Sequence, residues 1–398
     1  MKILVLNCGS SSVKYKLIDM PSANVLEQGG LEKLGLKDSF LKHSKGEGEK
    51  KIIQKEIAEH TAGIEFILQV LTDPGSGVLN SLSEIDAVGH RVVHGGEKFN
   101  SSVRITNEVI AQIEECIPLA PLHNQANLKG IRAIEKLMPE VPQVAVFDTA
   151  FHQTMPQEAF MYALPYEFYE EKGVRRYGFH GTSHHYVSQK AFETLNIKPE
   201  GSRIITCHIG NGGSITAVKD GKSIDTSMGM TPLEGLVMGT RVGDIDAGTI
   251  TYLMKECKYD ADQISEILNK KSGLLGISGV SSDMRDVQGK IAEGNKRAEL
   301  AVEMFQYRVK KYIGSYIAAL GGLDVLVFTG GIGENNAKIR ELICENMEYF
   351  GIRIDKNINA ETIGEQRILS PEGAKVTVIV IPTDEELMIA SDTQRILG

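Results

Sequence analysis

The chain has 398 residues, enough for two or three domains that each bury a sizeable core. Its 42% hydrophobic and 24% charged residues are typical of a globular protein, and its net charge of −9 argues against a general surface for nucleic acid or anionic membranes. The five cysteines are scattered without a CxxC pair, which favours a reducing compartment over disulfides or a zinc site. No apolar run approaches the roughly 18 residues of a membrane span. We therefore expect a soluble, cytoplasmic protein that binds neither nucleic acid nor membranes.

The first predicted element is a hairpin at residues 3–19, ILVLNCGSSSVKYKLID. Four apolar residues run into Asn7, Cys8 and Gly9, three serines follow, and an alternating strand then resumes. The turn is longer than a two-residue hairpin connection and offers small side chains and free backbone N–H groups. It serves either as an ordinary surface turn or as a cradle for an anion.

Residues 42–60 carry dense mixed charge, which predicts a solvated excursion. After them, short β-rich segments alternate with helical patterns, and this alternation predicts an α/β architecture with a largely parallel or mixed sheet. Ligands of such sheets bind beyond the carboxyl ends of the strands. Arg91 lies in the apolar segment AVGHRVVHGG, where its charge needs a partner or a ligand, and Asp148 ends the strand in AVFDTAFH.

Three histidines cluster in YGFHGTSHHYV, and His180 and His184 have the i,i+4 spacing of a zinc protease helix. Gly181 stands where such a site requires glutamate, so we favour an imidazole that donates hydrogen bonds to phosphoryl oxygens. Further along, Arg241 lies among glycines in LEGLVMGTRVGDIDAG. The polar turn SSDMRD at residues 281–286 offers another acid and another arginine. Each of these charged residues is equally compatible with an ion pair, a helix cap or a surface turn.

The hairpin design of residues 3–17 recurs in IITCHIGNGGSITAV, residues 204–218. The separation is too large for a solenoid repeat, so we interpret it as duplication of a whole domain. Apolar residues at three- and four-residue spacing predict a core-facing helix over 296–320, ended by glycines. A third glycine-rich segment, VFTGGIGEN at 327–335, follows a buried strand. One such segment is compatible with a tight turn, whereas three at strand ends favour an anion-binding cleft.

The last strand ends at Pro382, before TDEELMIAS. Thr383 and Glu386 have the spacing of a capping box, which leaves Glu385 for solvent or for a metal such as Mg²⁺. The sequence contains neither a Walker A motif nor a GxGxxG motif after a strand, so phosphate binding requires another two-domain arrangement.

Together these motifs resemble the acetate kinase family. NCGSSSVKYKL, GHRVVHGG, FDTAFH, YGFHGTSH, HIGNGGS, DTSMGMTPLEGLVMGTRVGDID, GGIGEN and TDEE follow the family's order and spacing from residue 1 to about 390. The resemblance implies membership of the sugar-kinase, chaperone and actin-like superfamily. It therefore implies an α/β fold of two duplicated actin-like (ribonuclease H-like) domains with a nucleotide cleft between them. We expect one domain at residues 1–150, joined by a C-terminal helix at 384–398, and a second at 151–383 that carries most of the nucleotide site.

The resemblance implies reversible phosphoryl transfer between ATP and acetate, giving ADP and acetyl phosphate. The implied cofactor is Mg²⁺, for which Mn²⁺ can substitute, and the implied assembly is a homodimer. One alternative is a propionate or other short-chain acyl kinase with a roomier pocket. Another is a non-catalytic ATP-binding switch module of the same fold, which would not require all of the charged residues described above.

Site residues follow from the resemblance, motif by motif. The implied catalytic residues are Asp148, His180 and Arg241, and the implied magnesium residues are Asn7 and Glu385. Arg91 is implied to bind the substrate, with Val93, Leu122, Phe179 and Pro232 around its acyl group. The implied nucleotide residues are Lys14, His208, Ile209, Gly210, Asn211, Gly212, Asp283, Met284, Arg285, Gly331, Ile332, Gly333, Glu334 and Asn335.

Acetate is already ionised near pH 7, so no proton has to leave the nucleophile. We therefore expect Asp148 to orient Arg91 or the hydrated magnesium ion rather than to act as a general base. Phosphoryl transfer requires mainly alignment and neutralisation of the equatorial oxygens, which arginines, a histidine and Mg²⁺ supply.

Overall fold

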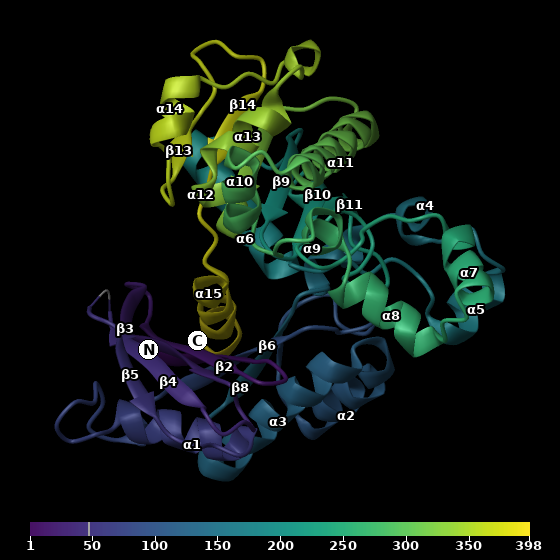
Figure 1. Cartoon of the computed structure of the whole chain (residues 1–398). Coiled ribbons are helices and arrows are strands. Elements are labelled where there is room, and N and C mark those ends of the chain that lie inside the picture. The colour runs from purple at the N-terminus through teal and green to yellow at the C-terminus, as the bar shows by residue number, and fades with distance from the viewer. Residues whose placement is uncertain (47) are drawn as a thin grey trace. The chain divides into compact units, whose positions relative to one another are not determined.

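The structure is a computed structural model that describes residues 1–46 and 48–398. The chain divides into two compact units, Met1–Phe151 with Asp384–Gly398 and His152–Thr383. Each unit is built around its own β-sheet with helices packed against it (Figure 1). In the part of the chain that the structure describes, no helix is both long and apolar enough to cross a membrane.

The first unit contains an eight-stranded sheet in the order β5-β4-β3-β2-β1-β6-β8-β7. β1 pairs with β6 in parallel and with β2 in antiparallel orientation. Its elements are β1 (Lys2–Cys8), β2 (Val13–Asp19), β3 (Asn24–Glu32), β4 (Phe40–Lys45), β5 (Lys51–Gln54), α1 (His60–Leu71), η1 (Leu82–Glu84), β6 (Ala87–Val92), β7 (Val103–Arg104), α2 (Asn107–Glu115), η2 (Ile117–Leu119), α3 (Pro121–Leu137), β8 (Gln143–Phe147), η3 (Ala150–Thr154), which runs past the end of the unit, and α15 (Glu385–Leu397).

Both faces of this sheet are covered, because the side chains of β1 alternate between two cores. Leu4 and Leu6 pack with residues of α1 and α3, whereas Ile3 and Val5 pack with residues of α15. Figure 1 shows α15, at the C-terminal end of the chain, beside the N-terminal strands of the same unit. The C-terminal helix thus belongs to the first unit and covers one face of its sheet.

The second unit contains a six-stranded sheet in the order β11-β10-β9-β12-β14-β13, against which α6 and α11 pack. Its elements are α4 (Gln157–Phe160), α5 (Tyr166–Lys172), α6 (Gly181–Leu195), β9 (Arg203–Ile209), β10 (Gly213–Lys219), β11 (Lys222–Thr226), α7 (Ala247–Glu256), α8 (Ala261–Lys270), α9 (Gly273–Ser278), α10 (Met284–Ala292), α11 (Lys296–Leu320), β12 (Val325–Thr329), α12 (Gly330–Asn335), α13 (Ala337–Cys344), η4 (Glu348–Phe350), α14 (Lys356–Glu361), β13 (Arg367–Ile368) and β14 (Thr377–Val380).

The two sheets repeat one topology. The order β3-β2-β1-β6-β8-β7 in the first unit corresponds strand for strand to β11-β10-β9-β12-β14-β13 in the second. In each unit a long hairpin opens the sheet, two parallel strands follow on its other side, and an antiparallel strand closes the edge. The predicted α/β fold built from two duplicated domains is confirmed.

Two local predictions had different outcomes. The helix predicted at 296–320 is α11, and it ends at Gly321, whose φ of 71° is the left-handed conformation that glycine adopts at low cost. The prediction of a solvated excursion at 42–60 was wrong in part, because β4 and β5 extend the sheet through it. β5 is the edge strand of the sheet, and exposed lysines on a sheet edge resemble loop composition. Residue 47 of this segment lies outside the described residues.

Candidate active site

The candidate residues form two sets, one on each unit. On the first unit they are Asn7, Lys14, Arg91, Val93, Leu122, Asp148 and Glu385. On the second unit they are Phe179, His180, Pro232, Arg241 and the segments 208–212, 283–285 and 331–335.

Arg91 is the centre of the first set. It lies on β6, and Asp148 follows the end of the neighbouring strand β8. Its Nε donates to Asp148 Oδ1 at 3.0 Å, and its Nη2 donates to Oδ2 at 2.5 Å. Burial disfavours the charge of Arg91, but the carboxylates of Asp148 and Glu385 outweigh burial and raise its pKa. This bidentate contact fixes the plane of the guanidinium group.

Asn7 and Glu385 approach the same guanidinium group. Asn7 lies on β1, and its Oδ1 accepts a hydrogen bond from Arg91 Nη1 at 3.4 Å. Glu385 is the first residue of α15, and its Oε2 lies 3.8 Å from Arg91 Nε. Burial raises the pKa of Glu385 to about 7; Arg91 opposes this rise and Asp148 adds to it. The structure thus brings Asn7, Asp148 and Glu385 together around Arg91.

These oxygen atoms suit Mg²⁺ in kind. Among the described residues no three His, Cys, Asp or Glu side chains form a metal cluster, and the proposed metal residues supply one carboxylate, Glu385, and the Asn7 amide. Mg²⁺ commonly binds one or two carboxylates together with substrate phosphates and water, so this small donor set fits it. The raised pKa of Glu385 indicates that desolvation and the neighbouring carboxylates outweigh the positive charge of Arg91 at this carboxyl group.

Lys14 stands directly opposite Asn7 in the β1–β2 hairpin. It lines a cavity of about 420 Å³ on the first unit, together with residues of β2, β3 and β4, among them Lys16 and Lys42, and with Lys50, which precedes β5. The placement of Lys14 beside the Asn7 turn therefore follows from the hairpin register.

Val93 and Leu122, the other two candidates of the first unit, lie outside the strands of its sheet. β6 ends at Val92, so strand alternation does not carry past it to Val93, whose N–H donates to Asn127 Oδ1 at 3.0 Å. Leu122 lies in the first turn of α3 and is 70% exposed. The capping box predicted at Thr383 was also wrong: Asp384 caps α15 by accepting from Leu387 N at 3.0 Å.

On the second unit, three segments far apart in sequence line one pocket of about 520 Å³. They are the glycine turn at Gly210 and Asn211, the start of α10 and the helix α12. The predicted nucleotide residues that line it are Gly210, Asn211, Asp283, Met284, Arg285, Gly331, Ile332 and Asn335. Ser282 and Asn336 also line it and were missed, although each directly adjoins a predicted residue.

Three further nucleotide candidates, Ile209, Gly333 and Glu334, belong to the contact between β9 and α12. Gly330 has φ 75°, and a Cβ there would meet Ile209 N and O at 2.9 Å, so only glycine lets α12 approach β9 this closely. Glu334 Oε1 accepts from Gly330 N at 2.8 Å, which closes the first turn of α12. The buried Arg340 donates to the carbonyls of Gly333 and Glu334, each at 2.9 Å.

Asp283 and Arg285 form a fork at the start of α10. Asp283 accepts from the Arg285 backbone at 2.8 Å, and Arg285 Nη2 donates to Asp283 Oδ2 at 2.6 Å. Hydrogen bonding to Arg285 lowers the pKa of Asp283 to about 2. The Arg285 side chain is 87% exposed, so it is a cation at the surface of this pocket.

His180 and Arg241 meet at the glycine turn. A Cβ placed on Gly212 would lie 3.3 Å from Arg241 Nη1 and 3.8 Å from His180 Nε2. His180 precedes α6 with a left-handed φ of 56°, and its ring stacks on His208 with centroids 4.3 Å apart. The structure therefore brings two predicted catalytic side chains to the turn that carries three predicted nucleotide residues, Gly210, Asn211 and Gly212.

Arg241 has no carboxylate partner among the residues described. Its Nη1 donates to the Pro232 carbonyl at 3.0 Å and lies 3.7 Å from Met238 Sδ. Burial lowers the pKa of Arg241. A partly buried guanidinium without a counter-charge has unused capacity to bind an anion.

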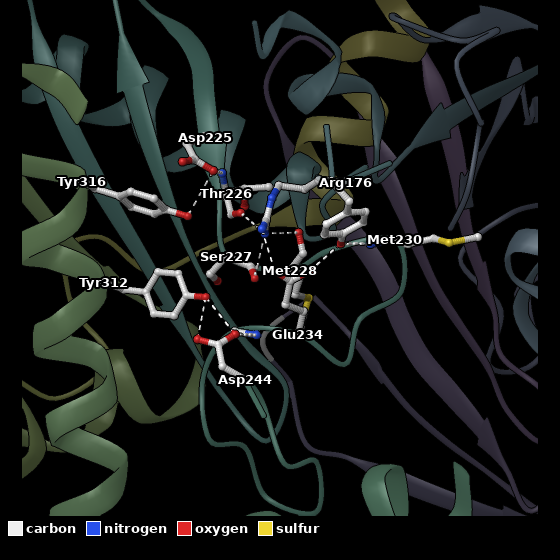
Figure 2. A network of polar contacts seen from close by, with 12 residues as sticks. Arg176, Asp225, Thr226, Ser227, Met228, Met230, Glu234, Asp244, Tyr312 and Tyr316 are labelled. Carbon is white, nitrogen blue, oxygen red and sulfur yellow. Dashed lines mark hydrogen bonds and ion pairs between the residues drawn. The ribbon is translucent and has the colours of Figure 1, made fainter. Parts of the chain in front are cut away.

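Sequence reasoning missed the network that holds the loop between β11 and α7 (Figure 2). Arg176 Nη1 donates to the carbonyls of Thr226, Ser227 and Met228 at 2.8, 3.2 and 3.3 Å. Its Nη2 donates to Glu234 Oε1 at 2.6 Å, and Tyr162 OH donates to Glu234 Oε2 at 2.5 Å. This loop carries Pro232 and Arg241, so the network fixes their backbone.

The sequence model of the Acetokinase family matches residues 2–391. The chain belongs to the acetokinase family. The acetate kinase of Bacteroides thetaiotaomicron is 62% identical over 397 residues, and that of Phocaeicola vulgatus 63% identical over 398, with full coverage of both chains in each case. The crystal structure of Porphyromonas gingivalis acetate kinase has a TM-score of 0.97 and 60% identity over the whole of both chains.

A solved structure with another printed activity is also similar to the chain. The crystal structure of a propionate kinase from Francisella tularensis has a TM-score of 0.93 and 45% identity, again covering both chains fully. These full-length likenesses confirm the family resemblance and the two-domain α/β fold.

Proposed function

We propose that the protein is an acetate kinase, which transfers a phosphoryl group reversibly between ATP and acetate to give ADP and acetyl phosphate. The observation that carries this proposal is the guanidinium of Arg241, which lies beside His180 at the Gly212 turn and has no carboxylate partner in the described part of the chain. Positive charge and an N–H donor at a backbone anion cradle are what the transferring phosphoryl group requires.

The second unit would hold the nucleotide. The pocket at residues 210–211, 283–285 and 331–335 has a volume suited to a ligand of nucleotide size. Successive backbone N–H groups of the glycine turn would bind phosphate oxygens, and Arg285 would add positive charge at the surface of the pocket. His180 and Arg241 would neutralise the charge that develops on the phosphoryl oxygens.

The first unit would bind the carboxylate substrate through Arg91. Asp148 occupies Nε and Nη2 of that guanidinium group, which leaves the orientation of Arg91 fixed and Nη1 directed toward Asn7. Because acetate needs no deprotonation near pH 7, Asp148 would act by positioning Arg91. Asn7 and Glu385 would hold Mg²⁺ or Mn²⁺. A metal held there would neutralise negative charge on the phosphate groups.

A propionate kinase is the second candidate, because a structure of that activity is 45% identical over the full chain. The two activities share their chemistry and differ in the space around the acyl group. We further propose that the protein works in the cytoplasm as a homodimer, as the family resemblance implies.

The deciding experiment is an acyl-hydroxamate assay with ATP, Mg²⁺ and a series of carboxylates from formate to butyrate. We expect hydroxamate formation with the highest kcat/KM for acetate. A higher value for propionate would assign the second candidate. Nucleotide binding without hydroxamate from any acid would indicate a non-catalytic module. Arg241→Ala serves as the control for contaminating activity.

A further inference from the structure

Behind His180, a chain of buried side chains runs from α6 into the sheet. His180 Nδ1 lies 2.9 Å from Ser214 Oγ, and His184 Nε2 lies 2.7 Å from the same oxygen. On the far side of its ring, His184 Nδ1 lies 2.7 Å from Thr206 Oγ1. Ser214, His184 and Thr206 have no exposed surface. The chain therefore links His180 to the centre of the second unit through three groups that water does not reach.

The hydroxyl and imidazole hydrogens of this series of hydrogen-bonded side chains can be assigned one by one. The structure gives the hydroxyls of Ser214 and Thr206 no other side-chain or backbone partner in the described part of the chain. Burial, with the nearby His152 and His208, lowers the pKa of His184 well below its usual value, so this ring is neutral and carries one N–H. Each hydroxyl has a single hydrogen to donate, and a buried hydrogen without an acceptor is costly.

One arrangement gives every hydrogen an acceptor. Thr206 donates to His184 Nδ1, His184 Nε2–H donates to Ser214 Oγ, and Ser214 donates to His180 Nδ1. If His184 carried its hydrogen on Nδ1, the Thr206 hydroxyl hydrogen would have no acceptor. If His180 Nδ1 also carried a hydrogen while His184 kept its own on Nε2, the Ser214 hydrogen would have none.

We propose that Ser214, held by His184 and Thr206, is a positioning residue that keeps His180 in the tautomer with its hydrogen on Nε2. Nε2 is also the nitrogen 3.8 Å from the Gly212 Cβ position, on the side of Arg241. His180 thus presents an N–H donor toward the glycine turn while remaining neutral. The hydrogen bond at one imidazole nitrogen commonly selects the state of the other in this way.

The expected effect of these residues on kcat rests on the proposed function, whereas the expected tautomer of His180 does not. The test is ¹⁵N NMR of the full-length protein with labelled histidine, in which the two ring nitrogens of a neutral imidazole give well separated shifts. The His180 signals are assigned by their absence in His180→Gln. We expect the protonated nitrogen to be Nε2. Protonation at Nδ1 in the unsubstituted protein would overturn the proposal.

Two threonines paired across β9 and β10 supply a matched pair of variants. Thr206 and Thr216 stand opposite each other, but Thr216 Oγ1 contacts Thr226 Oγ1 at 2.9 Å and no histidine. Thr206→Val removes the hydroxyl group that fixes the direction of donation along these hydrogen bonds. Either of the two hydrogen-bond arrangements then leaves one His184 nitrogen unpaired. We expect a mixture of His180 tautomers and, because the competent fraction falls toward half, about a twofold or larger loss of kcat. Thr216→Val should leave the tautomer and kcat unchanged.

Ser214→Ala removes the contact with His180 itself. We expect a larger fall in kcat, about 10–100-fold, as is usual for partners that orient a functional histidine, with little change in the KM for ATP. If the His180 shifts stay those of the unsubstituted protein in both Thr206→Val and Ser214→Ala, the chain does not set the tautomer and the proposal fails. If the shifts change while kcat does not, positioning stands and the catalytic role proposed for His180 is what fails.

Discussion

Arg241 Nη1 donates a hydrogen bond to the backbone carbonyl of Pro232 at 3.0 Å. A proposed transition-state residue and a proposed wall of the acyl pocket are thereby joined in one loop. A change that moves this loop should affect both turnover and acyl preference, because neither residue can shift alone.

Arg241→Ala and His180→Ala should lower kcat by roughly 10²–10³-fold each, the usual cost of removing one donor to developing charge. The KM for ATP should change much less, since the lost interaction belongs to the transition state. Steady-state kinetics with ATP and acetate measures both. Near-normal turnover in both variants would contradict their catalytic assignment.

Gly212→Ala places a methyl group 3.3 Å from Arg241 Nη1 and 3.8 Å from His180 Nε2. We expect kcat to fall, because the guanidinium must shift to make room at the transferring group. Gly289→Ala, in the middle of α10, is the control: its Cβ meets nothing within 4 Å. That change should leave kcat intact and stabilise the fold by about 0.4–1 kcal/mol. Equal kcat in the two variants would contradict the placement of Arg241 and His180.

Glu234→Gln weakens the contact of Glu234 with Arg176 (Figure 2) and its contact with Tyr162. We expect a lower kcat and a loss of about 1–3 kcal/mol in the free energy of unfolding, the usual value of hydrogen bonds to charged groups. Glu193→Gln removes an exposed ion pair with Lys190 and should cost under about 1 kcal/mol without affecting kcat. A Glu234→Gln variant as active and stable as Glu193→Gln would show that the network does not hold the loop.

Val93→Ala tests the acyl pocket. If Val93 touches the acyl methyl, its truncation makes room for one methylene, whose burial is worth about 0.8 kcal/mol. Propionate's kcat/KM should then rise relative to acetate's, within the roughly 10–200-fold by which a pocket discriminates a single methylene. An equal loss of kcat/KM on both acids would indicate that Val93 only packs against its neighbours, which is compatible with its position beyond the end of β6.

Stability should fall in acid partly through His90. Burial lowers the pKa of this imidazole to about 4, partly offset by its hydrogen bond to Gln143. The unfolded chain binds the His90 proton more readily than the folded protein does. The free energy of unfolding is therefore unaffected by His90 above about pH 6.5 and falls by about 3 kcal/mol as the pH decreases toward 4. In His90→Gln the denaturation midpoint should depend less on pH between pH 7 and 4.5. Unchanged steepness would mean that His90 titrates normally in the folded protein.

The sequence was most informative where the determinants are local. The spacing of apolar residues over 296–320 and a terminal glycine suffice to define α11, and two similar hairpins suffice to indicate a duplicated sheet. The gathering of residues 210–211, 283–285 and 331–335 around one pocket followed from strand ends and the family resemblance.

Long-range partners were not predictable. Arg176 and Glu234 are 58 positions apart, and neither has a local pattern that names the other. The partners of His180 are similarly hidden, because Ser214 reads as part of a turn and His184 as a possible metal ligand. The role of Val93 stays a prediction: this residue lies one position past the end of β6, so strand alternation does not give the direction of its side chain.

The position of α15 has a consequence for biosynthesis. The first unit is interrupted by the whole of residues 152–383, and its last helix covers Ile3 and Val5. On the ribosome, that face of the sheet stays bare while more than half of the chain is still being made, and exposed strands of this kind are prone to aggregate. The same helix begins with Glu385. A nascent chain therefore cannot assemble the surroundings of Arg91 until the segment at residues 385–397 has emerged from the ribosome.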